Sequence, residues 1–180
     1  MLFLIPILLL AGAPSAPAQT ASETYWLYMN NDGQTWCGYR DSTEFKAQVE
    51  KMSPAPQQSG KVTYLAGKLA EVTEQFTPES GDWIVIDEYT PKNGALVVRR
   101  SNLLAQAQLR VVQTAVIEKG KVEPFRIESI TTSAGEQAEL PPHLDFPDVP
   151  IAADVSKLPL MSVVDEMRNR RIGRLCKKEG

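Results

Sequence analysis

Acidic side chains in the middle of the sequence are the first candidates for catalysis: Glu71, Glu74, Asp82, Asp87 and Glu88. Two carboxylates that converge on a cleft can act as general acid and general base in a hydrolase, as in glycosidases. Asp87 and Glu88 are adjacent in an expected strand, so their side chains point to opposite faces and cannot act together. Glu71 and Asp87 could face each other across a sheet. The alternative is that these carboxylates are polar residues on a solvated face.

A second candidate is the segment from His143 to Asp148, which holds the only histidine together with Asp145 and Asp148. Imidazole and carboxylate groups are ligands for zinc and for hard metal ions. The spacing of these three residues fits no established metal-ligand pattern, and prolines surround them. We therefore interpret the segment as an exposed loop and predict no metal site.

Other catalytic motifs are missing from the sequence. It contains no Gly-rich phosphate-binding loop, no Gly-x-Ser-x-Gly elbow and no Cys-x-x-Cys motif. A Ser-His-Asp triad would need His143, which lies in a Pro-rich segment rather than at the end of a strand. We predict no cofactor. The net charge of −3 also disfavours nucleic acid as a partner.

Aromatic residues are concentrated near the start of the chain, where Trp26, Trp36 and Tyr39 lie in two expected strands. Such a cluster can form a platform for a sugar or a peptide. It can equally be the packing of a hairpin into the core. We retain Trp26, Trp36 and Tyr39 as weak candidates for ligand binding.

The first eighteen residues are typical of a secretory signal peptide. Leu2 to Ala13 is an uncharged apolar run, too short to span a membrane, and Ala16-Pro17-Ala18 matches the small-residue pattern of a cleavage site. We expect a periplasmic or secreted protein without a transmembrane anchor after cleavage. In such a compartment the two cysteines, Cys37 and Cys176, are expected to form a disulfide. It would close a loop of roughly 140 residues.

The pattern of residues 19–139 predicts an α+β core domain. It begins with a hairpin, residues 24–39, and continues with a helix capped by Asp41 that carries Phe45, Val49 and Met52 on one face. An antiparallel meander follows, in which the turn Asn93-Gly94 joins strands 82–90 and 95–99. Residues 61–76 fit a strand or a helix, and we favour a strand. Residues 103–108 have helical propensity, whereas the valines after them favour a strand.

The end of the chain differs in composition from the core domain. Residues 140–159 contain five prolines, which exclude a regular helix and a central strand, so we predict an extended segment. Residues 160–180 are expected to form a basic helix packed on the core. Its basic end could contact an anionic surface, or it could simply complement the helix dipole.

Two functions remain consistent with the sequence. The preferred one is an exported, non-catalytic protein that binds a small ligand, a peptide or an envelope partner. The alternative is a small exported hydrolase that uses carboxylates on the sheet. The oligomeric state cannot be inferred from these patterns.

We predict that cleavage after Ala18 produces a mature protein that begins at Gln19, because Ala16-Pro17-Ala18 follows an apolar run of signal-peptide length. N-terminal sequencing of the protein from the cell-envelope fraction checks this start point. Recovery of the chain from membranes with Met1 intact would instead indicate an uncleaved anchor.

Overall fold

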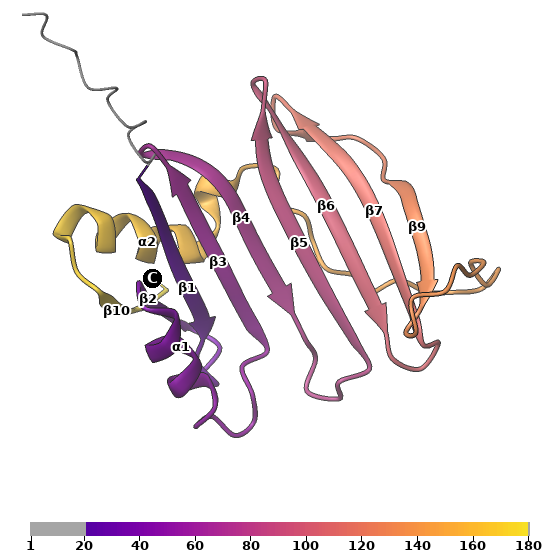
Figure 1. Ribbon diagram of the computed structural model, residues 1–180, viewed down its shortest axis with the longest axis horizontal. Coiled ribbons are helices and arrows are strands. Elements are labelled where there is room, and N and C mark those ends of the chain that lie inside the picture. The colour runs from indigo at the N-terminus through magenta and orange to yellow at the C-terminus, as the bar shows by residue number, and fades with distance from the viewer. Residues whose placement is uncertain (1–20, 180) are drawn as a thin grey trace, which may run out of the picture.

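The computed structural model describes residues 21–179. The predicted signal peptide, residues 1–18, lies outside these described residues. The described chain is α+β, as predicted, with two α-helices and one antiparallel sheet of ten strands (Figure 1). None of its helices is long and apolar enough to cross a membrane.

The strands are β1 (Ser22–Met29), β2 (Thr35–Tyr39), β3 (Gln58–Leu65), β4 (Lys68–Phe76), β5 (Trp83–Lys92), β6 (Ala95–Leu104), β7 (Leu109–Glu118), β8 (Lys121–Val122), β9 (Arg126–Thr132) and β10 (Arg174–Lys178). The helices are α1 (Ser42–Val49) and α2 (Pro159–Arg170), and a short 3-10 turn, Val155–Lys157, precedes α2. The order across the sheet is β10-β2-β1-β3-β4-β5-β6-β7-β8, and β9 also pairs with β7.

The main core lies between α2 and one face of the sheet, which we call the α2 face. Alternate residues of each strand point to this face because successive side chains in a strand alternate. The helix contributes Leu160, Val163, Val164 and Met167, which the 3.6-residue period places on one side. The strands contribute mainly Tyr25, Leu27, Trp36, Val62, Tyr64, Val72, Tyr89, Val98 and Ile117.

Two glycines allow α2 to approach the sheet closely. A Cβ atom at Gly38 would lie 2.8 Å from the sulfur of Met167, and one at Gly60 would lie 3.0 Å from a methyl group of Leu160. The Gly60 position is also blocked by backbone, because the carbonyl oxygen of Thr73 would be 2.9 Å away. Any larger residue at Gly60 would therefore push the helix and the strand apart.

Helix α1 packs on the opposite face of the sheet, which we call the α1 face. Its predicted N-cap is confirmed, since the Asp41 carboxylate accepts hydrogen bonds from the backbone N–H groups of Thr43 at 2.7 Å and Glu44 at 3.0 Å. The three predicted apolar residues of this helical region pack on a small buried cluster of the first hairpin: Phe45, Val49 and Met52 on Tyr28, Cys37 and Tyr39.

The Asn93-Gly94 hairpin is confirmed. Strand β5 pairs antiparallel with β6 from Trp83 opposite Leu104 to Lys92 opposite Ala95. Asn93 and Gly94 have φ values of 52° and 82°, the positive values that a tight two-residue turn requires.

Residues 61–76 are extended, as favoured, but they form two strands rather than one. Ala66 and Gly67, with φ values of 50° and 76°, reverse the chain between β3 and β4. The Lys-Leu-Ala-Glu stretch that resembles a helix is the start of β4, where pairing with β3 and β5 outweighs its local propensity. For the same reason residues 103 and 104 end β6, and a turn leads into β7.

The predicted C-terminal helix over residues 160–180 is wrong beyond Arg170. Arg171 adopts a left-handed conformation, with φ 55°, and ends α2. Residues 174–178 then form β10, which pairs antiparallel with β2 at the edge of the sheet. A helix over residues 174–178 would have no apolar side to pack on the core. As a strand, these residues instead form backbone hydrogen bonds with the free edge of β2. The Pro-rich segment is extended, as predicted, apart from the 3-10 turn at its end.

The predicted disulfide is confirmed. Cys37 and Cys176 are directly opposite each other in β2 and β10, and their Cα atoms are 4.0 Å apart. The bond therefore attaches the last strand to the first hairpin, rather than the last helix. The indole N–H of Trp36 also donates to Glu179 at 2.9 Å, which adds a second attachment for the C-terminal end.

We expect Cys176→Ser to lower the free energy of unfolding by up to about 4–5 kcal/mol, because it removes a constraint on a long loop of the unfolded chain. Urea denaturation without reductant measures this loss, and limited trypsin digestion should release β10 before the rest unfolds. Cys37→Ser is the matched control and should give the same loss. Two reactive thiols per denatured, unreduced wild-type chain would contradict the disulfide.

Candidate functional site

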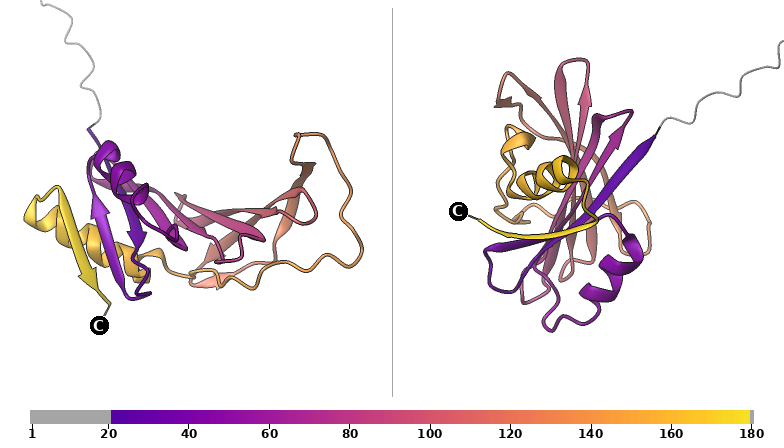
Figure 2. Two further views of the ribbon diagram at one scale, coloured as in Figure 1. Left: turned by 90° about the horizontal axis from the view of Figure 1, so that it is seen from below. Right: turned by 90° about the vertical axis from the view of Figure 1, so that its left-hand side faces the viewer.

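The two faces of the sheet differ in what covers them. Seen along the strands, α2 and the Pro-rich segment lie on one side and α1 lies on the other (Figure 2). The Pro-rich segment packs on the α2 face through Ile151, Ala152 and Val155, and the Ala152 N–H donates to the Tyr89 hydroxyl at 3.2 Å. On the α1 face, α1 covers β1 and β2, and no described helix covers β5, β6 and β7 (Figure 1).

A row of ionisable side chains is buried on the α2 face. Cross-strand pairing places Glu74 of β4 opposite Asp87 of β5, and Asp87 opposite Arg100 of β6. Glu74 is 5% exposed and Asp87 is fully buried. The Arg100 guanidinium donates to both Asp87 carboxylate oxygens at 2.7 Å, a bidentate pair. The expected pairing of Glu71 with Asp87 does not form, because Glu71 is opposite Thr63 and points to the α1 face.

Glu74 forms no ion pair with a residue of the described chain, because Arg100 is paired with Asp87. Burial, and secondly the neighbouring charge of Asp87, raise the pKa of Glu74 to about 7. A carboxyl with such a pKa can donate and accept protons near neutral pH. However, Glu74 and Asp87 line none of the three cavities that we describe below, and the bidentate contact with Arg100 occupies both oxygens of Asp87. A ligand in any of these cavities would therefore not contact this pair.

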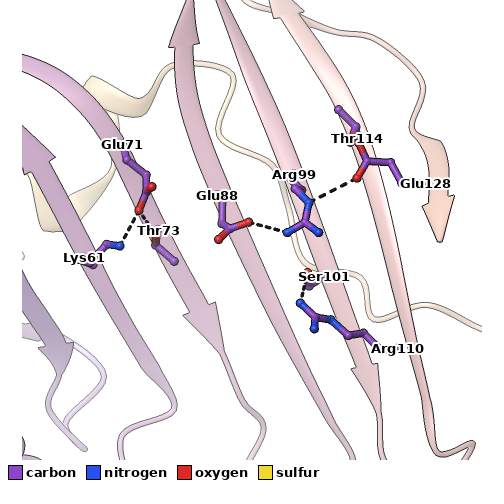
Figure 3. A network of polar contacts seen from close by, with 9 residues as sticks. All are labelled: Lys61, Glu71, Thr73, Glu88, Arg99, Ser101, Arg110, Thr114 and Glu128. Carbon is purple, nitrogen blue, oxygen red and sulfur yellow. Dashed lines mark hydrogen bonds and ion pairs between the residues drawn. The ribbon is translucent and has the colours of Figure 1, made fainter. Parts of the chain in front are cut away.

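The α1 face of the same strands carries a network of polar contacts (Figure 3). Arg99 of β6 contacts Glu88 of β5 at 3.0 Å and Glu128 of β9 at 3.4 Å. Lys61 of β3 contacts Glu71 of β4 at 2.6 Å. All these groups are partly exposed to solvent, so each pair contributes little to stability. Each of the three carboxylates in this network is engaged by a cation of another strand.

A cavity of about 570 Å³ lies at the end of the sheet where β5 begins and β6 ends. We call it the sheet-end cavity. Its apolar walls are formed mainly by the aliphatic side chains Ile84, Leu103, Leu104 and Leu109 and by the indole of Trp83. Its polar groups are the Arg110 guanidinium of β7 and the hydroxyls of Thr131, Thr132 and Ser133 in and after β9. The lining residues are Gly81, Trp83, Ile84, Leu103, Leu104, Ala105, Gln108, Leu109, Arg110, Thr131, Thr132, Ser133 and Gly135.

Strand register explains how these residues meet. Ile84, Leu103 and Arg110 are opposite one another in β5, β6 and β7, and Thr131 of β9 extends the same row. The row belongs to the α1 face, the same face as Arg99. The turn between β6 and β7 closes one side of the cavity, through Ala105 and Gln108.

Arg110 differs from Arg99, which lies on the same face. Its guanidinium approaches the Ser101 hydroxyl at 3.5 Å, and no carboxylate of residues 21–179 lies within ion-pair distance of it. Arg99, two strand rows away, is held by two glutamates. The sheet-end cavity thus combines apolar walls with one uncompensated positive charge.

A smaller cavity of about 320 Å³ adjoins the first one and shares Trp83 and Leu104 with it. The Pro-rich segment forms its outer wall through Leu144, Phe146 and neighbouring residues. The segment from His143 to Asp148 therefore packs in part against the sheet, although His143 itself is exposed. Within residues 21–179, no group of three His, Cys, Asp or Glu side chains could hold a metal ion.

Two of the three aromatic residues predicted as a ligand platform are neighbours, and the third lies on the other face of the sheet. Trp26 and Tyr39 are opposite each other in β1 and β2 on the α1 face. Trp26 is half-buried there, whereas Tyr39 is fully buried and its ring stacks on Tyr28 at 5.9 Å. Trp36 is 2% exposed and belongs to the core of the α2 face. None of the three lines the cavities that we describe, and ligand binding by these residues stays a prediction.

Sequence patterns did not indicate the sheet-end cavity, because its walls come from four separate segments. The one local signal is Arg110 among the apolar residues Leu109, Val111 and Val112. No protein-family model, curated protein or solved structure matches this chain. The functional argument therefore depends on the geometry alone.

Glu74 generates a prediction about pH. Its pKa is higher in the folded protein than the ordinary value of 4.5, so the folded state holds this proton more tightly. The resulting stability is complete below about pH 4.5 and is lost as the pH rises through about 7. We expect the free energy of unfolding to fall by roughly 2–3 kcal/mol from about pH 5 to about pH 8 through this group.

Glu74→Gln mimics the protonated carboxyl and should remove this part of the fall. Urea denaturation at the two pH values measures it. Glu88→Gln, on the other face of the sheet, is the matched control and should keep the fall seen in the wild type. If Glu74→Gln kept the full fall as well, Glu74 would not be the group that titrates.

Proposed function

We propose that the protein is exported and non-catalytic, and that it binds a small amphipathic anion in the sheet-end cavity. The observation that carries this proposal is the guanidinium of Arg110, which has no carboxylate partner within residues 21–179 and lines a largely apolar cavity of about 570 Å³. Cavities of this size accommodate small ligands, and a few polar groups on apolar walls orient them. The disulfide and the signal-peptide pattern support export to the periplasm or outside the cell.

The chemistry of the walls indicates the class of ligand. Ile84, Leu103 and Leu109 favour a hydrocarbon body, because apolar surface gains free energy when it leaves water. Arg110 favours a carboxylate, sulfonate or phosphate group, which a guanidinium can bind with two hydrogen bonds. The hydroxyls of Thr131 and Ser133 can bind a polar linker between the two parts. A fatty acid has the hydrocarbon body and the anionic group, and an acyl chain joined through a polar linker to an anionic group has all three features.

The alternative, a hydrolase, has one specific observation in its favour. Glu74 and Asp87 are neighbours, and the pKa of Glu74 lies near 7, as a general acid requires. Against it, both carboxylates are buried, and Arg100 holds Asp87. A hydrolase would require the Pro-rich segment to leave the α2 face, and hydrolysis that disappears in Glu74→Gln but persists in Arg110→Gln would favour it.

We predict that dodecanoate binds the mature protein and that Arg110→Gln weakens this binding about tenfold, through loss of a charge-assisted contact. Calorimetric titration measures the affinity, and Trp83 fluorescence reports occupancy because Trp83 lines the cavity. Dodecanol, which lacks the charge, should bind the wild type and Arg110→Gln equally.

The matched control is Arg99→Gln, which removes a guanidinium from the same face outside the cavity. It should leave the dodecanoate affinity unchanged, because Arg99 is engaged with Glu88 and Glu128. Equal weakening by both variants would indicate attraction by overall charge rather than a site. Absence of dodecanoate binding to the wild type would contradict the proposed ligand class.

A further inference from the structure

A second cavity, of about 520 Å³, lies at the opposite end of the molecule and is lined by three arginines. Arg40 follows β2, and Arg168 and Arg171 lie at the C-terminal end of α2, on the left in Figure 1. Glu23 and Tyr25 of β1 form its floor. We call it the arginine cavity. It shares no lining residue with the sheet-end cavity, so the inference below does not depend on the proposed function.

Two of these arginines are already arranged around an anion of the protein itself. The same oxygen of the Glu23 carboxylate lies 3.5 Å from the Arg40 guanidinium and 3.5 Å from that of Arg168. It also accepts a hydrogen bond from the Tyr25 hydroxyl at 2.8 Å, which is the main reason why the pKa of Glu23 is lowered. The position between the two guanidinium groups therefore favours a negatively charged oxygen.

Aromatic rings hold both guanidinium groups in place. Arg168 lies 3.6 Å from the centre of the Tyr64 ring, and Arg40 lies 5.4 Å from that of Tyr25. Stacking of this kind restricts the orientation of a guanidinium while leaving its N–H groups free to donate. The two donors are consequently positioned before a ligand arrives, which reduces the entropy that binding costs.

Arg171 is the third donor, and no residue of the described chain forms an ion pair with it. Its neighbour Arg170, in contrast, contacts Glu166 at 3.0 Å. Arg171 also has a φ of 55°, at the helix end where glycine is favoured because any Cβ is strained. The chain keeps an arginine at a position where glycine would be less strained, and this arginine lines the cavity.

We propose that the arginine cavity binds a phosphoryl group, with Arg40, Arg168 and Arg171 as donors and Glu23 as the internal anion that the ligand displaces. A phosphate presents several charged oxygens, which suits three guanidinium groups better than a single carboxylate does. Asp165 also lines the cavity and reduces its net positive charge, but the three arginines outnumber the two carboxylates, Glu23 and Asp165. The phosphoryl group can belong to a soluble molecule or to a lipid headgroup.

The test is titration of the mature, disulfide-bonded protein with inorganic pyrophosphate at constant ionic strength, followed by calorimetry. We expect saturable binding, about tenfold weaker in Arg171→Gly through loss of one charged donor. Glycine relieves the strain at this position, so the melting temperature of Arg171→Gly should be equal to or higher than that of the wild type. Binding and stability thus change in opposite directions, which a purely structural role of Arg171 would not produce.

Two further variants complete the test. Arg170→Gln is the matched control, because it removes an adjacent guanidinium that does not line the cavity, and it should leave the affinity unchanged. Glu23→Gln removes the internal competitor and should strengthen binding. The proposal is overturned if pyrophosphate does not bind, if Arg170→Gln weakens binding as much as Arg171→Gly, or if Glu23→Gln also weakens it in a folded protein.

Cosedimentation with vesicles distinguishes the two sources of the phosphoryl group. Phosphatidylcholine vesicles with added phosphatidic acid are compared with phosphatidylcholine alone. Retention on the phosphatidic acid vesicles that is lost in Arg171→Gly supports a lipid headgroup in this cavity. Pyrophosphate binding without vesicle retention supports a soluble phosphorylated ligand.

Discussion

The close contact between α2 and the sheet is the constraint on which the rest of the structure depends. One amphipathic helix has to cover the buried side of β2 and β3, and it can do so only because Gly38 and Gly60 leave room for Met167 and Leu160. The helix is too short to cover the whole face. The Pro-rich segment continues the cover towards β5, where Ala152 reaches Tyr89.

Because α2 and the Pro-rich segment cover only one face of the sheet, charged side chains of β5 and β6 are buried on that face and more exposed on the other. Under the Pro-rich segment, Asp87 is tolerated because Arg100 satisfies both of its oxygens, and Glu74 avoids the cost of an unpaired buried charge by keeping its proton up to about pH 7. On the α1 face no described helix covers β5, β6 and β7, and Arg99 and Arg110 remain exposed there. Glu74, the carboxyl whose pKa is raised to about 7, therefore lines neither the sheet-end cavity nor the arginine cavity.

The two cavities lie at opposite ends of the structure, and each is built where the regular pairing of strands stops. At the sheet end, the β6–β7 turn leaves Arg110 without a carboxylate from a neighbouring strand. At the other end, α2 stops at Arg171 before the chain enters β10, and its last turns face the start of β1. The disulfide between β2 and β10 fixes this second arrangement, because it prevents the edge strand from separating.

Local sequence patterns were sufficient for the features that depend on neighbouring residues: the α+β class, the Asp41 cap, the Asn93-Gly94 turn and, with the expected compartment, the Cys37–Cys176 bond. Only the tertiary structure determined that residues 174–178 form a strand, because they are extended by pairing with the free edge of β2 and not by their own propensity. The same holds for both cavities. Arg110 and Arg171 are ordinary surface arginines in the sequence, and strand register and a helix end determine which carboxylates can reach them.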